Sequence, residues 1–204
     1  ATANAEMVML ANENPTLHSI LNNASLVVPD GAGILWAAER QGEHVPERVT
    51  GVDVTKELFK VAATHQIPVY CLGAAPGVAQ RAIDNVSAQV GVLNIAGIHD
   101  GFFDSAEEQE IIKSIAESKA KLVFVALGVP KQEQWIAEKL SHLDGVVAIG
   151  IGGSFDVLAG NIPRAPEWMQ QNRLEWLYRL YLEPQRIGRM LAIPKFMWTV
   201  IRNK

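Results

Sequence analysis

The sequence predicts a doubly wound α/β fold: a mostly parallel sheet with helices on both faces, followed by a helical appendage. Short apolar runs alternate with helical patterns of about 10–15 residues after residue 24. The strand-like runs are apolar at successive positions, which is typical of parallel strands buried on both faces. Beyond Gly160 the alternation stops and only helical spacing remains.

The first elements follow from short runs and their endings. Leu26–Val28 is an apolar run that stops at a Pro-Asp-Gly sequence, so we expect a strand there. Apolar residues at helical spacing predict helices at Ile34–Gln41 and Val54–Thr64. The continuous apolar run at Pro68–Gly73 predicts a buried strand.

The same alternation continues to about residue 151. Acidic residues gather at the start of the Ser105–Ser118 pattern, where the helix dipole favours negative charge. The expected elements are, in order, helix Val78–Val90, strand Leu93–Gly97, helix Ser105–Ser118, strand Leu122–Leu127, helix Gln132–Leu143 and strand Val146–Ile151.

The last part of the chain differs in composition. Residues 1–163 hold 10 Lys and Arg against 19 Asp and Glu, whereas residues 164–204 hold 8 against 3 and three of the five tryptophans. Prolines divide this segment into two expected helices, Pro166–Glu183 and Gln185–Val200. Basic residues interleaved with aromatic ones suit an anionic membrane surface. The longest apolar stretch, Met190–Ile201, is shorter than the roughly 20 residues that a transmembrane helix needs.

Composition places the chain among soluble globular proteins, with 49% hydrophobic and 20% charged residues. Its one cysteine, Cys71, lies in an apolar run and is expected to be a buried structural thiol. No disulfide framework can form from one cysteine, which favours a reducing compartment. The first residues lack the basic start and apolar block of a signal peptide, so we expect a cytoplasmic protein.

Nearly every expected strand runs into glycine. The five loops are Pro29–Gly33, Gly73–Gly77, His99–Gly101, Gly128–Glu133 and Gly150–Asp156. Glycine lets the backbone approach a ligand closely, and a following helix offers free N–H groups to an anion such as a diphosphate. Turns between strands and helices also favour glycine for purely conformational reasons. Five such loops on one rim of a parallel sheet favour a ligand site.

Several common sites are missing from the sequence. Gly31-Ala32-Gly33 is only a partial dinucleotide fingerprint, because residue 36 is Trp36 and not glycine. There is no P-loop, no Asp-x-Asp pair for a nucleotide-bound cation, and no His or Cys spacing typical of a metal site. Charge on a leaving group would then be met by backbone dipoles and arginines.

Two aspartates in these loops have alternative interpretations. Asp30 is either an N-cap or Asx-turn residue for the helix that follows, or a general base at a strand end where partial burial raises its pKa. Asp156 either caps a turn or accepts a hydrogen bond from a ribose or base.

Seven stretches together resemble the WecG/TagA/CpsF glycosyltransferases, in order and over essentially the whole chain. They are Ala3-Asn4-Ala5-Glu6, Pro29-Asp30-Gly31-x-Gly33, Glu47-Arg48-Val49-x-Gly51-x-Asp53, Gly128-x-Pro130-Lys131-Gln132-Glu133, Gly152-Gly153-Ser154-Phe155-Asp156-Val157-x-x-Gly160, Arg164-Ala165-Pro166 and Leu174-Glu175-Trp176-Leu177-Tyr178-Arg179-Leu180. Members of the family usually carry a further strand and helix before the first stretch, so the resemblance implies a shortened chain or a sheet without that element.

The resemblance implies an inverting, metal-independent transfer of a sugar. The donor would be a UDP-sugar, typically UDP-N-acetylmannosamine, and the acceptor polyprenyl-diphosphate-linked N-acetylglucosamine, as in teichoic acid-type cell-wall biosynthesis. Asp30 would be the base; Thr2, Asn4, Arg48 and Gln132 would line the active-site pocket; and the turn of Gly152 and Gly153 before Asp156 would hold UDP. No metal, other cofactor or nucleic acid is expected.

The resemblance also divides the chain by role. Residues 1–163 would be the nucleotide-sugar-binding catalytic domain, and residues 164–204 an appendage that reaches the inner face of the cell membrane and closes over the pocket. Arg179, Arg186 and Arg189 would face the diphosphate, and their spacing places them on one face of a continuous helix, which Pro184 interrupts. A solvated or lipid-facing basic stripe is the alternative for these arginines.

Three other functions stay open. Relatives with similar motifs transfer glucose or other hexoses, so the donor sugar is not fixed by the motifs. A nucleotide-sugar-binding scaffold without chemistry would bind UDP but transfer nothing, and an NAD-dependent oxidoreductase is disfavoured by the incomplete fingerprint. An apolar patch left by a detached tail would support self-association as a homo-oligomer.

Overall fold

The computed structural model describes residues 1–172 and 174–202, except the side chain of Arg186. The chain forms two compact units. We call Gly51–Ile162 the central unit, and Ala1–Thr50 together with Pro163–Lys204 the terminal unit.

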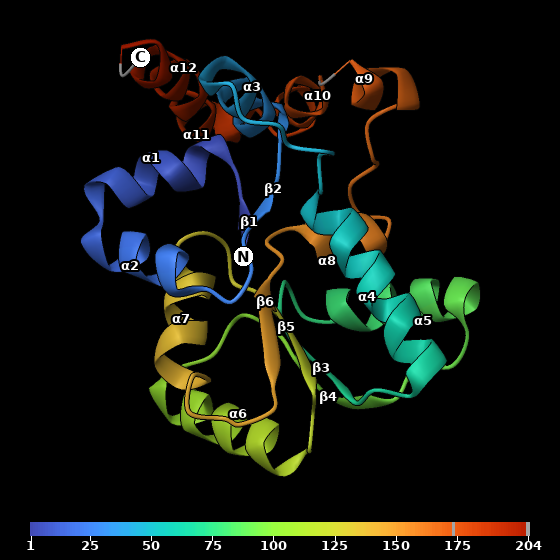
Figure 1. Ribbon diagram of the computed structural model, residues 1–204. Coiled ribbons are helices and arrows are strands. Elements are labelled where there is room, and N and C mark those ends of the chain that lie inside the picture. The colour runs from blue at the N-terminus through green and yellow to red at the C-terminus, as the bar shows by residue number, and fades with distance from the viewer. Residues whose placement is uncertain (173, 203–204) are drawn as a thin grey trace. The chain divides into compact units, whose positions relative to one another are not determined.

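A four-stranded parallel sheet forms the middle of the central unit (Figure 1). Its strands are β3 (Val69–Gly73), β4 (Ile95–His99), β5 (Leu122–Ala126) and β6 (Val147–Gly150), in the order β4-β3-β5-β6. Every residue of β3 and β5 is buried. These are the two central strands, and continuous apolar runs are what burial on both faces requires.

Helices cover both faces of this sheet, which confirms the predicted fold class (Figure 1). Helices α4 (Gly51–His65), α5 (Val78–Val90) and α8 (Ser154–Leu158) pack on one face, where Val69 and Cys71 of β3 point. Helices α6 (Ser105–Glu117) and α7 (Lys131–Lys139) pack on the other, against Tyr70 and Leu72. Side chains of a strand alternate between faces, so one strand serves two cores.

The side of the sheet on which the connecting helix lies changes between β3 and β5. The helix after β3 lies on one face and the helix after β5 on the other, and ligands bind at such a switch point in open α/β sheets. The strands approach closely here: a Cβ on Gly73, whose φ is +117°, would stand 2.4 Å from the Ala126 carbonyl oxygen. Only glycine fits this strand end.

The terminal unit has a separate two-stranded parallel sheet. Its strands are β1 (Thr2–Ala3) and β2 (Val28–Pro29), and its first helices are α1 (Ala5–Glu13), α2 (Pro15–Asn23) and α3 (Ala32–Gln41). The strand expected at Leu26–Val28 is therefore two residues long and belongs to this small sheet. The expectation of five glycine loops on one rim is wrong, because only four of them follow strands of the central sheet.

The tail forms more and shorter helical segments than the two helices expected from the sequence. It forms α9 (Glu167–Gln171), α10 (Glu175–Leu182), a 3-10 turn η1 (Pro184–Arg186), α11 (Ile187–Met190) and α12 (Ala192–Arg202). Pro194 does not end α12, because it lies in the first turn, where a helix needs no N–H donor.

The last helix packs into a core of the terminal unit. Phe196 and Val200 of α12 lie buried with Ala5 and Met9 of α1. An ion pair between Lys195 and Glu13 ties the same two helices at the surface. The tail of this structure is thus part of the hydrophobic core of the unit that holds the N-terminal segment.

Candidate active site

The small sheet brings together three of the predicted site residues. Thr2 pairs with Val28 in register, and the backbone N–H of Asp30 donates to the Ala3 carbonyl oxygen at 2.7 Å. Asn4 and Gly31 are neighbours, since a Cβ on Gly31 would lie 3.9 Å from that of Asn4. The ends of two parallel strands therefore hold Thr2, Asn4 and Asp30 side by side.

The structure decides one of the alternatives for Asp30. Gly31, with φ of +95°, occupies the N-cap position of α3. Asp30 is therefore not the N-cap residue of α3, while its interpretations as an Asx-turn residue and as a general base both stay open. Asp30 is partly buried directly after β2. Asn4, in contrast, is a true N-cap: its Oδ1 accepts from the Met7 N–H at 2.9 Å.

Gly33 serves helix packing. A Cβ at this position would lie 3.3 Å from the Cβ of Ala5 and 3.7 Å from the Phe196 ring. The space above Gly33 is thus taken by α1 and α12, while Gly31 supplies the left-handed backbone that starts α3.

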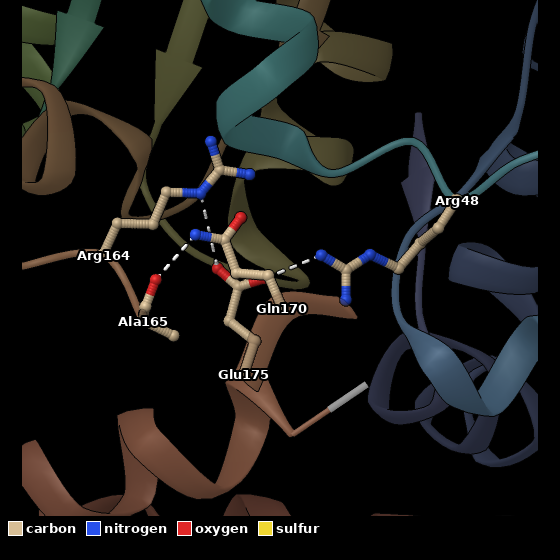
Figure 2. Close-up of polar contacts among 5 residues, drawn as sticks. All are labelled: Arg48, Arg164, Ala165, Gln170 and Glu175. Carbon is tan, nitrogen blue, oxygen red and sulfur yellow. Dashed lines mark hydrogen bonds and ion pairs between the residues drawn. The ribbon is translucent and has the colours of Figure 1, made fainter. Parts of the chain in front are cut away.

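Arg48 lies beside the end of strand β2, and its side chain contacts a carboxylate of the tail. The Val49 N–H donates to the Pro29 carbonyl oxygen at 3.0 Å, which places the Arg48 segment beside β2. Figure 2 shows the Arg48 side chain directed at Glu175 of α10, with 2.8 Å between Nη2 and Oε2.

A second arginine approaches the same carboxylate. The Nε of Arg164 lies 4.0 Å from Oε1 of Glu175, and Gln170 donates to the Ala165 carbonyl oxygen at 2.6 Å beside it (Figure 2). Two guanidinium groups thus flank one carboxylate, and the three side chains carry a net charge of +1. Sequence reasoning assigned no role to Glu175, and its place inside a family stretch was the only signal.

The other tail arginines lie on separate helical segments. Arg179 is partly buried on α10, and Arg189 on α11 pairs with Glu6 of α1 at 2.6 Å. Arg186 lies in η1, and its side chain is outside the described part. The interruption expected at Pro184 is present, because α10 ends at Leu182 and the turn η1 separates it from α11.

The remaining predicted residues belong to the central unit, and Gln132 joins two of its glycine loops. The Oε1 atom of Gln132 accepts from the Gly128 N–H at 3.2 Å and from the Gly152 N–H at 3.0 Å. Its Nε2 donates to Glu133 Oε1 at 2.7 Å. Gln132 therefore ties the loop after β5 to the loop after β6.

The Gly152-Gly153 turn leads into α8, where Asp156 is held by a polar chain. Gly152 has φ of +52° and Gly153 is the N-cap of α8. The Nδ2 of Asn161 donates to Asp156 Oδ1 at 3.0 Å, and Arg81 donates to Asn161 Oδ1 at 3.1 Å. These bonds fix one carboxylate oxygen of Asp156.

Glu133 is a buried carboxyl that sequence reasoning did not single out. Burial raises the pKa of its side chain, partly offset by the hydrogen bond from Gln132. Its Oε2 has no hydrogen-bond partner among the described residues. Cys71, which is also buried in the central unit, fits its expected structural role, because burial in the sheet raises the pKa of its thiol.

The whole chain, residues 1–204, matches the glycosyl transferase WecG/TagA/CpsF family. The chain belongs to this family. It is 36% identical over its full length to an N-acetylglucosaminyldiphosphoundecaprenol N-acetyl-beta-D-mannosaminyltransferase of Bacillus subtilis, covering 79% of that protein. Enzymes of the same name from Bacillus spizizenii and Staphylococcus aureus are 38% and 33% identical over the full chain, which covers 78% and 79% of them.

Membership of the WecG/TagA/CpsF family makes the chain a glycosyltransferase, as predicted. The individual roles of Asp30, Thr2, Asn4, Arg48, Gln132 and the other site residues stay predictions. Within residues 1–172 and 174–202, no three His, Cys, Asp or Glu side chains gather as a metal site would require. A reaction without a metal also stays a prediction.

Proposed function

We propose that this glycosyltransferase moves N-acetylmannosamine from UDP-N-acetylmannosamine to N-acetylglucosamine on a polyprenyl diphosphate, in teichoic acid-type biosynthesis. The observation that carries the proposal is the similarity, over the full length of this chain, to three enzymes named for transfer of this sugar to this kind of lipid-linked acceptor. The predicted site segments of the terminal unit and of the central unit both lie within the matched length.

In the proposed reaction Asp30 is the general base. Its carboxylate takes the proton of the acceptor hydroxyl as that oxygen forms a bond to the anomeric carbon of the sugar. The bond from this carbon to the diphosphate oxygen breaks, UDP leaves with the electron pair, and the anomeric configuration inverts. Support comes from the position of Asp30 directly after strand β2, where its side chain is partly buried.

Arginines and backbone groups would meet the charge of the diphosphates without a metal. Arg48 has donors beyond the one that contacts Glu175, since a guanidinium carries five N–H groups. Arg179, Arg186 and Arg189 are proposed to contribute to the same task. In the central unit, Gly152 and Gly153 would receive UDP, and Asp156 would accept from its ribose or base.

We further propose that the tail binds the inner face of the cell membrane peripherally. None of the helices in the described part of the chain is long and apolar enough to cross a membrane. The tail nevertheless exposes large apolar side chains among its basic residues: Trp168, Trp176, Leu177, Tyr181, Ile187, Leu191, Met197, Trp198 and Ile201.

The test is incubation of the chain with a short-chain polyprenyl-diphosphate-N-acetylglucosamine acceptor and a panel of UDP-sugars, read by mass spectrometry. We expect one added N-acetylhexosamine, and only with UDP-N-acetylmannosamine. Addition of a hexose from UDP-glucose would give the enzyme another donor. UDP binding without any product would favour a scaffold, and either result would reject the proposed transfer.

A further inference from the structure

Gln132 and Glu133 form a buried polar pair at the start of α7. Gln132 is 1% exposed and Glu133 is 4% exposed, although both are residue types that usually lie at the surface. A buried amide or carboxyl is costly unless it is hydrogen-bonded. The pair therefore calls for a role that an apolar pair could not fill.

The hydrogen bonds of Gln132 allow only one orientation of its amide. Its oxygen accepts from two backbone N–H groups, those of Gly128 and Gly152. A rotated amide would place its NH2 group against these two donors, and Glu133 would then face the amide oxygen. Glu133 Oε1 accepts from Gln132 Nε2 at 2.7 Å and so selects the orientation that holds both loops.

The end of β6 lies close against the polar ends of this pair. A Cβ on Gly150 would stand 2.5 Å from Nε2 of Gln132 and 2.7 Å from Oε1 of Glu133. Contacts under 3.0 Å force something to shift. The absence of a side chain at Gly150 thus allows the pair to pack against the backbone of β6. The pair lies between the ends of two neighbouring strands, β5 and β6.

We propose that Glu133 is a positioning residue of the donor-nucleotide site: it holds the Gln132 amide so that Gln132 fixes the Gly128 and Gly152 loops at the spacing that UDP requires. The inference rests on the proposed binding of UDP by the Gly152-Gly153 turn. Glu133 itself touches no substrate and acts through Gln132. One hydrogen-bond acceptor at Oε1 is all that this role needs, so a glutamine can replace Glu133.

Four variants of the full chain test the proposal: Glu133→Gln, Glu133→Leu, Gly150→Ala and Glu108→Leu. Glu133→Gln keeps the acceptor, whereas Glu133→Leu removes it. Gly150→Ala displaces the pair without deleting a polar group. Glu108→Leu is the matched control, because Glu108 also gives a carboxylate to α7, at Trp135 and Lys139, but does not contact Gln132.

Two readouts are needed: the dissociation constant of UDP by calorimetry, and the hydrogen exchange of the Gly128 and Gly152 N–H groups by NMR. For Glu133→Leu and Gly150→Ala we expect UDP binding to weaken about tenfold. Exchange at both glycines should also rise relative to the Ile151 N–H, which is bonded to Val125 within the sheet. Glu133→Gln and Glu108→Leu should match the parent in both.

The two readouts separate the possible failures. Parental exchange at Gly128 and Gly152 in Glu133→Leu and Gly150→Ala would overturn the positioning role. Loss of UDP affinity in Glu133→Gln equal to that in Glu133→Leu would overturn it as well, since the acceptor is then not what matters. A parent chain that does not bind UDP would reject the proposed function, while the exchange data would still decide whether Glu133 holds the loops.

Discussion

Asp30 is the residue on which the proposed chemistry depends. We expect Asp30→Asn to lower turnover by about 100-fold or more, because an amide cannot take the proton from the acceptor. UDP affinity should be unchanged, since the base does not bind the nucleotide. Single-turnover kinetics and calorimetry measure the two effects. Asp144→Asn, at an exposed turn, is the control, and near-parental turnover of Asp30→Asn would remove Asp30 from the role of base.

Glu175 separates two guanidinium groups, so its removal should destabilise the protein. Glu175→Ala deletes a partly buried, charge-assisted hydrogen bond and leaves Arg48 and Arg164 without the carboxylate between them. We expect the free energy of unfolding in urea to fall by about 1.5 to 3 kcal/mol. Glu57→Ala is the comparison, because Glu57 pairs with Lys60 at the surface and such pairs contribute about 0 to 1 kcal/mol. Equal losses would mean that the Glu175 cluster contributes no more than a surface pair.

Glu133 makes the stability of the protein depend on pH. Burial raises its folded-state pKa above the unfolded value, so folding favours the protonated form and stability is lost as pH rises from about 4 through the folded pKa. Glu133→Gln has no such loss. We therefore expect the melting temperature of Glu133→Gln, minus that of the parent, to increase as the pH is raised from about 4, near the unfolded-state pKa of a glutamate. A constant difference would show that Glu133 does not titrate in this way.

At the scale of elements, the sequence predicted the central unit well because each signal there is local. Strands β3 and β5 are continuous apolar runs, and α6 begins with a capping box of Asp104 and Glu107. Strand β1 has only two residues, so it shows no periodicity that could be recognised. The break in the tail at Pro184 was predicted, whereas its other breaks were missed because helical spacing continues through them.

The difference between local and long-range signals also explains which residues of the candidate site could be predicted from the sequence. Asp30 could be selected because a carboxylate followed by glycine at a strand end is a local pattern. The partner of Arg48 is 127 positions away, and only folding brings Glu175 to it. Glu133 lies within a family stretch, but its burial against Gly150 depends on the approach of β6 to α7. Contacts between distant segments are what the sequence alone did not predict.

One face of helix α12 packs against helix α1, and substitution of two aromatic residues of α12 tests this packing. Phe196 is 4% exposed against α1, whereas Trp198 is 60% exposed on the same helix. We expect Phe196→Ala to lower the free energy of unfolding by about 3 to 5 kcal/mol. Trp198→Ala should change it by less than about 0.5 kcal/mol. Urea unfolding measures both, and similar values for the two variants would contradict the packing of α12 on α1.

At the scale of the whole molecule, charge and exposed apolar surface are unevenly distributed. The tail has 8 basic and 3 acidic residues, while the rest of the chain is acidic. Its exposed aromatic side chains lie among these basic residues, so hydrophobic and electrostatic attraction to an anionic membrane would act together. Deletion of the tail is a poor test of this idea, because it would also remove Phe196 and Val200 from a core.

Substitution of exposed tail residues tests membrane binding without that damage. We expect the combined change Trp168→Ala, Tyr181→Ala and Trp198→Ala to weaken binding to vesicles rich in anionic lipid by at least about tenfold, since full burial of even one large apolar side chain contributes roughly 1.5 to 3 kcal/mol. Phe102→Ala is the control, because Phe102 is 74% exposed in the central unit. Co-sedimentation with vesicles measures the affinity. Binding should also weaken as salt screens the basic residues. Parental affinity of the triple variant, or equal loss in Phe102→Ala, would show that the tail is not the surface that meets the lipid.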